Sequence, residues 1–496
     1  MTKHSTDTSG LRGMVLAGLS GGSGKSVAAV GLLAALRARG LNVLPFKKGP
    51  DYIDAGWMAK AAGAPCYNLD PYLTGPEQLR ATFFRHLQEK MTVALVEGNR
   101  GVFDGVNASG TYSTAELAIL LNLPILLVVN CSKTTRTVAA LVMGCRLFDP
   151  RLRIAGVILN QVATSRHEHI LRESLAQTGD IPVLGIIPRL AADIFPMRHL
   201  GVTPHQEYRD AEQAVAALGN MAAQHFDLDA ILSRMQTITL PAQPEAKQPA
   251  HTSLPLRINS PHTKSKLRIG VLRDAAFQFY YEENLKALQE GGAELVMINA
   301  LSAEALPVGL HGLYIGGGFP ETSAQALADN HSFRHSLRTA IDDGLPVYAE
   351  CGGLIYLGRS ILLAGREYPL TGIFPVIFSL STKPQAHGYS ILSVEGENSF
   401  YRQGLHIKGH EFRYSKVQEW SGQSRDLVLR MQRGTGFMDG RDGLVYNNVL
   451  ALYTHVLASG TPEWASGFLA AASGYAHTVA VHSAGEHGQS AEDQGR

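Results

Sequence analysis

Cysteine is scarce in this sequence. Its 496 residues contain only Cys66, Cys131, Cys145 and Cys351, and no two of these form a C-x-x-C pair. Structural zinc sites and disulfide frameworks need closely spaced or paired cysteines, so the sequence indicates neither. Such cysteine usage is typical of a reducing compartment, and we expect a cytoplasmic location.

The sequence also lacks an excess of charge of either sign. Its 44 lysine and arginine residues are balanced by 43 aspartate and glutamate residues. Proteins that bind nucleic acid usually carry a basic footprint, so we expect no nucleic-acid partner.

Long hydrophobic runs are missing as well. The most apolar stretch, residues 115–129, is interrupted by Glu116, Asn122 and Pro124 and is too broken to span a membrane. Residues 1–12 are polar and lack the apolar centre of a signal peptide. We therefore expect a soluble protein without a membrane partner, and its length predicts two domains.

What the sequence does contain is an alternation of apolar runs with helical patterns. Over residues 13–235 this alternation is typical of a mostly parallel, doubly wound α/β sheet. Residues 236–265 have the composition of a linker, and residues 266–472 hold a second strand–helix series. The polar residues 473–496 are predicted to be a disordered tail. The expected strands are residues 14–17, 43–46, 93–96, 125–129, 154–159, 183–187, 267–272, 295–298, 313–315 and 347–349.

A glycine-rich loop joins the first predicted strand to a predicted helix. Residues 18–26 read GLSGGSGKS, with Leu19 where the usual P-loop has its first glycine. Such a loop directs backbone N–H groups and the positive end of a helix dipole at phosphate oxygens. We interpret it as an ATP-binding loop rather than a glycine turn without chemistry. The residues expected to bind ATP are Gly21, Gly22, Gly24, Lys25 and Ser26, with Ser26 also on Mg²⁺.

Charged side chains follow two further predicted strands. Lys47, Asp51 and Asp54 come after the strand at residues 43–46, whereas Glu97 and Asp104 follow the strand at residues 93–96. Ligands of open α/β sheets gather at the carboxyl ends of the strands. Phosphoryl transfer needs such charges, because Mg²⁺ and lysines offset the developing negative charge. The alternative reading is a set of solvated turns.

The second half contains a cysteine in a turn of small residues. Cys351 stands between the predicted strand at residues 347–349 and an apolar helix start, which is typical of a nucleophile elbow with an exposed thiol. His455, at the end of a late apolar run, is the candidate base. The N–H groups of Gly317, Gly318 and Gly352 are predicted to form an oxyanion hole. Separately, a lone cysteine and a lone histidine are more often structural.

These motifs resemble the cobyrinate a,c-diamide synthase family over residues 13–472. The resemblance implies a dethiobiotin-synthetase-like ATP-binding domain followed by a flavodoxin-like class I glutamine amidotransferase domain. The matching segments are the G-x5-GKS loop, Gly49 to Asp54, Glu97 with Gly101 to Gly105, Ala155 to Asn160, Arg198 to Gly201, Arg273 to Phe277, Gly316 to Gly318, Glu350 to Gly353 and Gly409 to Phe412.

The family implies that ATP phosphorylates the a and c acetate carboxylates of a corrin-type tetrapyrrole, and that ammonia from glutamine then forms the amides. Mg²⁺ and ATP are the implied cofactor and co-substrate, the implied partners are glutamine, ATP and the tetrapyrrole, and a homodimer is the oligomeric state considered. The resemblance assigns Cys351 and His455 to glutamine hydrolysis. It implies a substrate and acyl-phosphate site of Lys47, Asp51, Tyr52, Asp54 and Asp104, and a metal site of Ser26, Glu97 and Asp51.

Two departures from the family pattern leave alternatives open. Related triad enzymes have a glutamate two residues after the histidine, where this chain has Leu457, so packing or backbone alone is expected to orient His455. Residues 130–136 and 460–464 resemble the branch linked to siroheme or sirohydrochlorin amidation. From other classes, a ParA-like partitioning or assembly NTPase and a non-catalytic tetrapyrrole carrier remain as alternatives.

Overall fold

The computed structural model describes residues 10–87, 92–177, 179, 181–190, 197–198, 201–240 and 266–492. The chain divides into two compact units, residues 1–249 and 250–496. From residue 241 onward the predicted linker lies outside the described residues, as do residues 493–496 of the predicted tail.

Unit 1 is built on a sheet with the strand order β3-β2-β4-β1-β5-β6-β7. These neighbours all pair in parallel, and β10 (Gln236–Thr237) adds an antiparallel edge to β1. The order reverses around β1, so the carboxyl ends of β1, β2 and β4 lie next to one another. The strands are β1 (Arg12–Gly18), β2 (Val43–Lys48), β3 (Tyr67–Leu69), β4 (Val93–Glu97), β5 (Ile125–Asn130), β6 (Ile154–Val162) and β7 (Val183–Pro188), with a separate pair β8 (Met197–Arg198) and β9 (Gly201–Val202).

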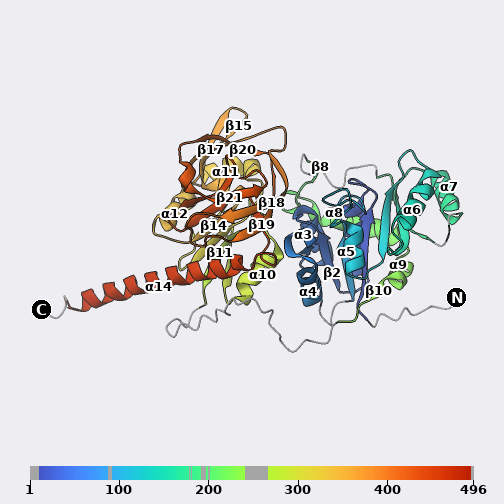
Figure 1. The fold of residues 1–496 in the computed structure, drawn as a ribbon, viewed down its shortest axis with the longest axis horizontal. Helices are drawn as coiled ribbons and strands as arrows, with labels where there is room; N and C mark the ends of the chain where they lie inside the picture. Colours follow the sequence, from blue (N-terminus) through green and yellow to red (C-terminus); the bar gives the residue numbers. More distant parts are fainter. Residues whose placement is uncertain are drawn as a thin grey trace. The chain divides into compact units, whose positions relative to one another are not determined.

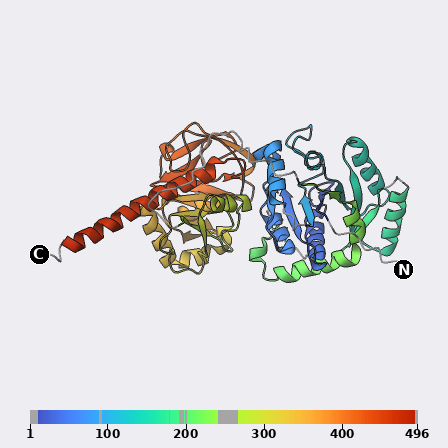
Figure 2. The ribbon, with the colours of Figure 1, turned by 90° about the horizontal axis from the view of Figure 1, so that it is seen from below.

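Helices cover both faces of this sheet (Figure 1, Figure 2). Alternate residues of β1 point to opposite faces: Leu16 packs in one core with α1, α2, α8 and α9, whereas Val15 packs in the other with α4, α5, α6 and α7. The predicted doubly wound arrangement is confirmed. The helices are α1 (Lys25–Ala38), α2 (Ile53–Ala62), α3 (Pro71–Thr74), α4 (Pro76–His86), α5 (Thr114–Leu120), α6 (Thr137–Phe148), α7 (Ser165–Ala176), η1 (His205–Glu207), α8 (Ala211–His225) and α9 (Leu228–Arg234).

Unit 2 contains a longer, mixed sheet with the order β12-β11-β13-β14-β23-β22-β21-β18-β19-β24. Its first five strands are parallel and the others antiparallel. The strands of this sheet are β11 (Arg268–Leu272), β12 (Glu294–Ile298), β13 (Gly312–Ile315), β14 (Val347–Glu350), β18 (Ala386–Val394), β19 (His406–Arg413), β21 (Leu427–Arg433), β22 (Arg441–Tyr446), β23 (Val449–Leu452) and β24 (His455–Val456).

A second, four-stranded sheet in unit 2 has the order β16-β15-β17-β20. Its strands are β15 (Gly358–Leu363), β16 (Arg366–Pro369), β17 (Phe374–Leu380) and β20 (Ser415–Trp420). The main sheet is covered on one face by α11, α12 and α13 and on the other by α10 and α14. The helices are α10 (Glu282–Glu290), η2 (Pro320–Ser323), α11 (Ala324–Asp329), α12 (His331–Asp342), α13 (Gly352–Leu357), η3 (Ser424–Asp426) and α14 (Glu463–Glu492).

The last helix differs from the sequence prediction. We expected a disordered tail from residue 473, but α14 continues to Glu492. Alanines at positions 470–472 favour helix, and no proline interrupts this stretch. Among the described helices, none has both the length and the apolar character needed to cross a membrane.

Candidate active sites

The predicted ATP-binding loop connects β1 to α1 at the carboxyl edge of the unit 1 sheet. Gly22 and Gly24 have positive φ of 73° and 93°, which glycine adopts without strain. Lys25 begins α1, and its Nζ donates to the carbonyl oxygens of Ser20 at 3.0 Å and Arg100 at 2.8 Å. Burial lowers the pKa of Lys25, against the opposite effect of the Glu97 carboxylate.

A buried cluster of charges lies beside this loop. Lys47 Nζ lies 2.7 Å from Asp54 Oδ2 and 3.1 Å from Glu97 Oε1, and Ser26 Oγ donates to Glu97 Oε1 at 3.0 Å. Burial alone would lower the pKa of Lys47, but the carboxylates of Asp54 and Glu97 raise it. Burial raises the pKa of Glu97, against the effect of Lys47. The structure therefore brings together four of the residues predicted for this site.

The donors of this cluster fit a magnesium ion. Glu97 Oε2 is buried and has no hydrogen-bond partner among the described residues, whereas Oε1 of the same carboxylate accepts the Ser26 hydroxyl. Mg²⁺ prefers oxygen ligands and is commonly held by one or two protein oxygens together with substrate phosphates. In the described part of the chain, no group of three or more His, Cys, Asp or Glu side chains could hold a metal ion by itself. Ser26 and Glu97 would hold the ion together with the nucleotide.

Three other predicted residues lie around this cluster with local structural roles. Asp51 Oδ1 accepts the Asp54 N–H at 2.9 Å, and burial raises the pKa of Asp51 to about 6. Tyr52 directly precedes α2. Asp104 Oδ2 accepts the Gly101 N–H at 2.8 Å. Asp51 and Asp104 thus order the loops after β2 and β4.

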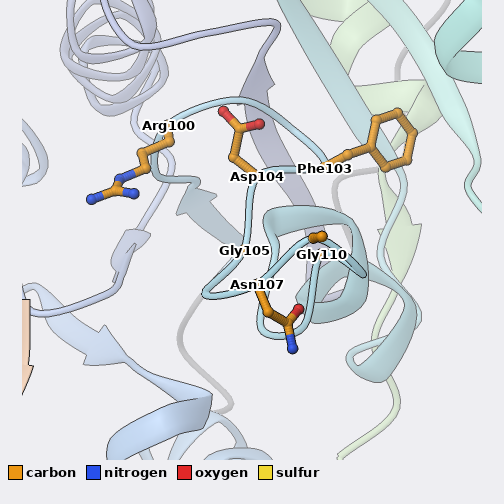
Figure 3. A pocket seen from close by; sticks show the side chains of 7 residues that line it. Arg100, Phe103, Asp104, Gly105, Asn107 and Gly110 are labelled. Carbon is orange, nitrogen blue, oxygen red and sulfur yellow. The ribbon is translucent and has the colours of Figure 1, made fainter.

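Two cavities open at this edge of the sheet. The first, of about 370 Å³, lies in the loop after β4, where Arg100 and Phe103 point to opposite sides (Figure 3). The second, of about 540 Å³, lies at the carboxyl ends of β5, β6 and β7. Its lining residues are Ser132, Lys133, Thr134, Thr135, Gln161, Ala163, His167 and Arg189.

Asn160 is a site residue to which sequence reasoning gave no role. Its Nδ2 donates to the carbonyl oxygen of Ser23 at 2.9 Å, and a Cβ on Gly24 would lie only 2.1 Å from this nitrogen. Asn160 therefore fixes the predicted ATP-binding loop from β6. Its position as a polar residue in a buried strand was the available signal.

In unit 2, Cys351 occupies a strained turn between β14 and α13. Its φ of 47° and ψ of −95° are rare for a residue with a side chain, and such backbone costs about 1–3 kcal/mol. The turn closes tightly, because a Cβ on Gly353 would lie 2.4 Å from the carbonyl oxygen of Ile315. The structure therefore has the geometry of a nucleophile elbow. The cysteine is more enclosed than expected, with 7% of its surface exposed.

His455, the first residue of β24, contacts Cys351. Burial disfavours the charged imidazole, but hydrogen bonds from His455 to Cys351 and Glu350, with their negative charges, raise its pKa to about 10. A Cβ on Gly317 would lie 2.4 Å from His455 Cε1, so only glycine leaves room for the ring. The structure thus brings the two predicted catalytic residues and one predicted glycine together.

The other two predicted glycines lie on either side of the elbow. A Cβ on Gly352 would lie 2.9 Å from the Gly318 nitrogen, so the two backbone segments are in contact. Among the described residues, neither amide N–H has a hydrogen-bond acceptor. Both N–H groups are therefore free to stabilise an oxyanion formed near Cys351.

Glu350 is the acidic residue that the sequence interpretation missed. Its Oε2 lies 3.4 Å from His455 Nδ1, and the carboxylate is fully buried. The expectation that packing or backbone alone orients His455 is therefore wrong. The carboxylate reaches the His455 ring from the residue before the cysteine, because the carboxyl end of β14 lies beside β24, where the Val456 N–H donates to Glu350 Oε1 at 3.1 Å. Leu457 is buried as an apolar residue.

A second histidine and an aspartate support His455. The β19–β24 pairing places His410 opposite His455, with ring centroids 4.9 Å apart, although sequence reasoning gave His410 no role. Burial and the neighbouring His455 lower the pKa of His410 well below its ordinary value, so this ring is neutral. Asp442 accepts the backbone N–H groups of Tyr453 and Thr454, which fixes the segment before His455.

The space available to His455 gives a first prediction. Gly317→Ala should displace the imidazole and reduce glutamine hydrolysis about 100-fold, because small misplacements of catalytic groups cost that much. Glutamate release at saturating glutamine measures the effect. Gly474→Ala is the matched control, since a Cβ there meets no atom within 4 Å. Full activity of Gly317→Ala would show that the ring position is not critical.

Comparison with known proteins agrees with this geometry. Residues 14–200 match the CobQ/CobB/MinD/ParA nucleotide binding domain, and residues 268–462 match the CobB/CobQ-like glutamine amidotransferase domain. A cobyrinate a,c-diamide synthase of Magnetococcus marinus is 42% identical over 431 residues, covering 87% of this chain and 91% of its own. A synthase of the same name from Dehalococcoides mccartyi is 37% identical, covering 89% of this chain and 94% of its own. One from Archaeoglobus fulgidus is 36% identical, covering 89% of this chain and 93% of its own.

A nucleotide-binding half and a glutamine amidotransferase half together define a glutamine-dependent amidotransferase that acts as a carbon–nitrogen ligase and uses ATP. The chain belongs to the cobyrinate a,c-diamide synthase family. The family and the fold class predicted from the sequence are confirmed.

Proposed function

We propose that the chain converts acetate carboxylates of a tetrapyrrole into carboxamides. In unit 1, a carboxylate oxygen attacks the γ-phosphorus of ATP, so that ADP leaves and an acyl phosphate forms. Ammonia then attacks the acyl carbon, phosphate leaves, and the amide remains. Lys25 and the N–H groups of Gly22 and Gly24 bind the phosphates, and Lys47 offsets the charge that develops. Mg²⁺, held by Ser26 and Glu97, would supply further neutralisation of phosphate charge.

Unit 2 supplies the ammonia in this proposal. The Cys351 thiolate attacks the side-chain carboxamide carbon of glutamine, and the N–H groups of Gly318 and Gly352 stabilise the resulting oxyanion. His455 gives its proton to the leaving nitrogen, so ammonia departs and a glutamyl thioester forms. Water, activated by His455, then releases glutamate and regenerates the thiol.

One observation carries this proposal: the same chain holds a Cys351–His455 pair in a glycine-lined elbow and a P-loop beside the buried Ser26–Glu97–Lys47 cluster. The cavity at the ends of β5, β6 and β7 is adjacent to the phosphate loop in strand order and is proposed to take the nucleoside. A partitioning or assembly NTPase would leave the cysteine elbow without a role.

Cobyrinate is the proposed macrocycle, since relatives that match nearly the whole chain carry the name cobyrinate a,c-diamide synthase. Siroheme and sirohydrochlorin, which present the same acetate groups, are the alternative suggested by residues 130–136. A homodimer remains a prediction.

A substrate screen tests this choice. The protein is incubated with ATP, Mg²⁺, glutamine and each of cobyrinate, sirohydrochlorin and siroheme, and the products are analysed by mass spectrometry. We expect cobyrinate to show two successive mass decreases, each corresponding to replacement of a hydroxyl by an amino group. Amidation of siroheme or sirohydrochlorin alone would replace the proposed substrate, and no amide with any macrocycle would remove the proposal.

A further inference from the structure

The carboxylate of Glu350 is fixed from two directions at the end of β14. Its Oε1 accepts the Val456 backbone N–H at 3.1 Å, and its Oε2 accepts the Tyr314 hydroxyl at 3.1 Å. The same Oε2 lies 3.4 Å from His455 Nδ1. Glu350 therefore faces Nδ1 of the imidazole, which leaves the other nitrogen, Nε2, available for proton transfer to the substrate.

We propose that Glu350 is the positioning acid of the glutamine-hydrolysing site: it holds the His455 ring and stabilises its imidazolium from the residue next to the nucleophile. This inference rests on the proposed function of unit 2. Glu350 takes the place of an acid at position 457, where this chain has a fully buried leucine.

A structural role alone does not account for the charge of Glu350. Its hydrogen bonds to Val456 and Tyr314 need only oxygen acceptors, which the amide of glutamine would partly supply. A fully buried carboxylate carries a large desolvation cost unless a cation or several donors compensate for it. The adjacent His455 becomes that cation when it takes the proton of the Cys351 thiol.

The other acids near this site are engaged elsewhere. Glu411 accepts the backbone N–H groups of Thr435 and Gly436, and Asp442 accepts those of the segment before His455. Both carboxylates therefore stabilise turns rather than the imidazole.

The groups around the pair favour one proton arrangement. His455 faces the thiol of Cys351, the carboxylate of Glu350 and the neutral ring of His410. With Nδ1 directed at Glu350, Nε2 is left for Cys351 and the departing ammonia. The raised pKa of His455 is consistent with this arrangement. The charge of Glu350 contributes to the raised pKa values of four buried tyrosines, after the larger effect of burial: Tyr280, Tyr314, Tyr348 and Tyr401.

Glu350→Gln tests the proposal because it keeps the shape and removes the charge. We expect the kcat of glutamine-dependent amidation to fall roughly 10²–10⁴-fold, as when the acid of a triad becomes an amide. The KM for glutamine should change by less than about threefold, since the carboxylate does not touch substrate. Amidation with ammonium chloride should keep its wild-type rate.

The pH dependence of glutamine hydrolysis distinguishes the proposed role of Glu350 from a purely structural one, because a structural role would not shift it. Loss of the carboxylate lowers the pKa of His455, so the imidazolium is lost at a lower pH than in the wild type. The alkaline limb of glutamine hydrolysis should therefore shift to lower pH. The pH profile of Cys351 alkylation by iodoacetamide should shift in the opposite direction, to higher pH, because a less basic His455 stabilises less of the reactive thiolate. This measurement requires no macrocycle.

Glu411→Gln is the matched control, because it makes the same change at another buried carboxylate of the same sheet. It should leave the alkylation profile unchanged. An unshifted alkylation profile in Glu350→Gln, or a loss of ammonia-dependent activity equal to the loss with glutamine, would overturn the proposal. If the wild type amidates no tetrapyrrole but Glu350→Gln still shifts the alkylation profile, the proposed function fails while the assignment of Glu350 stands.

Discussion

Replacement of Cys351 by alanine is expected to abolish glutamine-dependent amidation while leaving ammonia-dependent amidation intact. The thiolate is the nucleophile that attacks glutamine in the proposed hydrolysis, and removing a triad nucleophile costs about 10⁶-fold in kcat. Unit 1 contains the complete set of residues proposed for carboxylate activation, so external ammonia should still capture the acyl phosphate. Product formation with glutamine and with ammonium chloride, measured at equal ATP, checks both halves of this expectation.

Cys131→Ala is the matched control for this variant. Cys131 is also buried, but it lies in unit 1 after β5, and burial raises the pKa of its thiol to about 12. Its loss should leave glutamine hydrolysis unchanged. Retention of glutamine hydrolysis in Cys351→Ala would contradict the assignment of the nucleophile, whereas loss with both nitrogen donors would indicate a damaged fold.

The second large effect is expected at Lys25. Lys25→Ala should reduce amidation about 10²–10³-fold with either nitrogen donor, because a positioned charge that stabilises phosphoryl transfer is lost. ADP formation and amide formation should fall together, since ADP leaves as the acyl phosphate forms and the amide is made from that acyl phosphate. Glutamate release without macrocycle should be preserved, because Cys351 and His455 lie in the other unit.

Lys60→Ala provides the comparison for Lys25. Lys60 lies on α2 of the same unit, and its Nζ pairs with Glu212, which is largely exposed to solvent. Exposed pairs contribute at most about 1 kcal/mol, so this change should leave ADP formation intact. Equal losses in both lysine variants would point to general destabilisation, and an active Lys25→Ala would exclude its role at the phosphates.

The sequence predicted those parts of the sites that are local in the chain. The order strand, glycine loop and helix around residues 18–26 is set by neighbouring residues, and β1 and α1 lie where the pattern placed them. The charges after β2 and β4 could also be predicted to meet, because parallel strands bring their carboxyl ends to one edge. In the same way, the turn at Cys351 was evident from its small neighbours.

Contacts between distant segments were harder to predict. The sequence does not indicate that Glu350 lies close to His455, because their proximity depends on the pairing of β24 with β19. For the same reason His410 and Asp442 were given no role, and the four-stranded sheet of β15, β16, β17 and β20 was not predicted. Hydrophobic periodicity gives the type of an element but not its neighbours in a mixed sheet.

The adjacency of Glu350 and Cys351 has a consequence for how the site assembles. Three side chains on three separate segments would need two long-range closures, whereas here Glu350 and Cys351 are neighbours in the chain. Only the segment bearing His455 has to be brought in from elsewhere, so the entropic cost of closing a loop arises once. A change that disturbs the β14–β23 alignment would therefore displace the acid and the nucleophile as one body relative to the histidine.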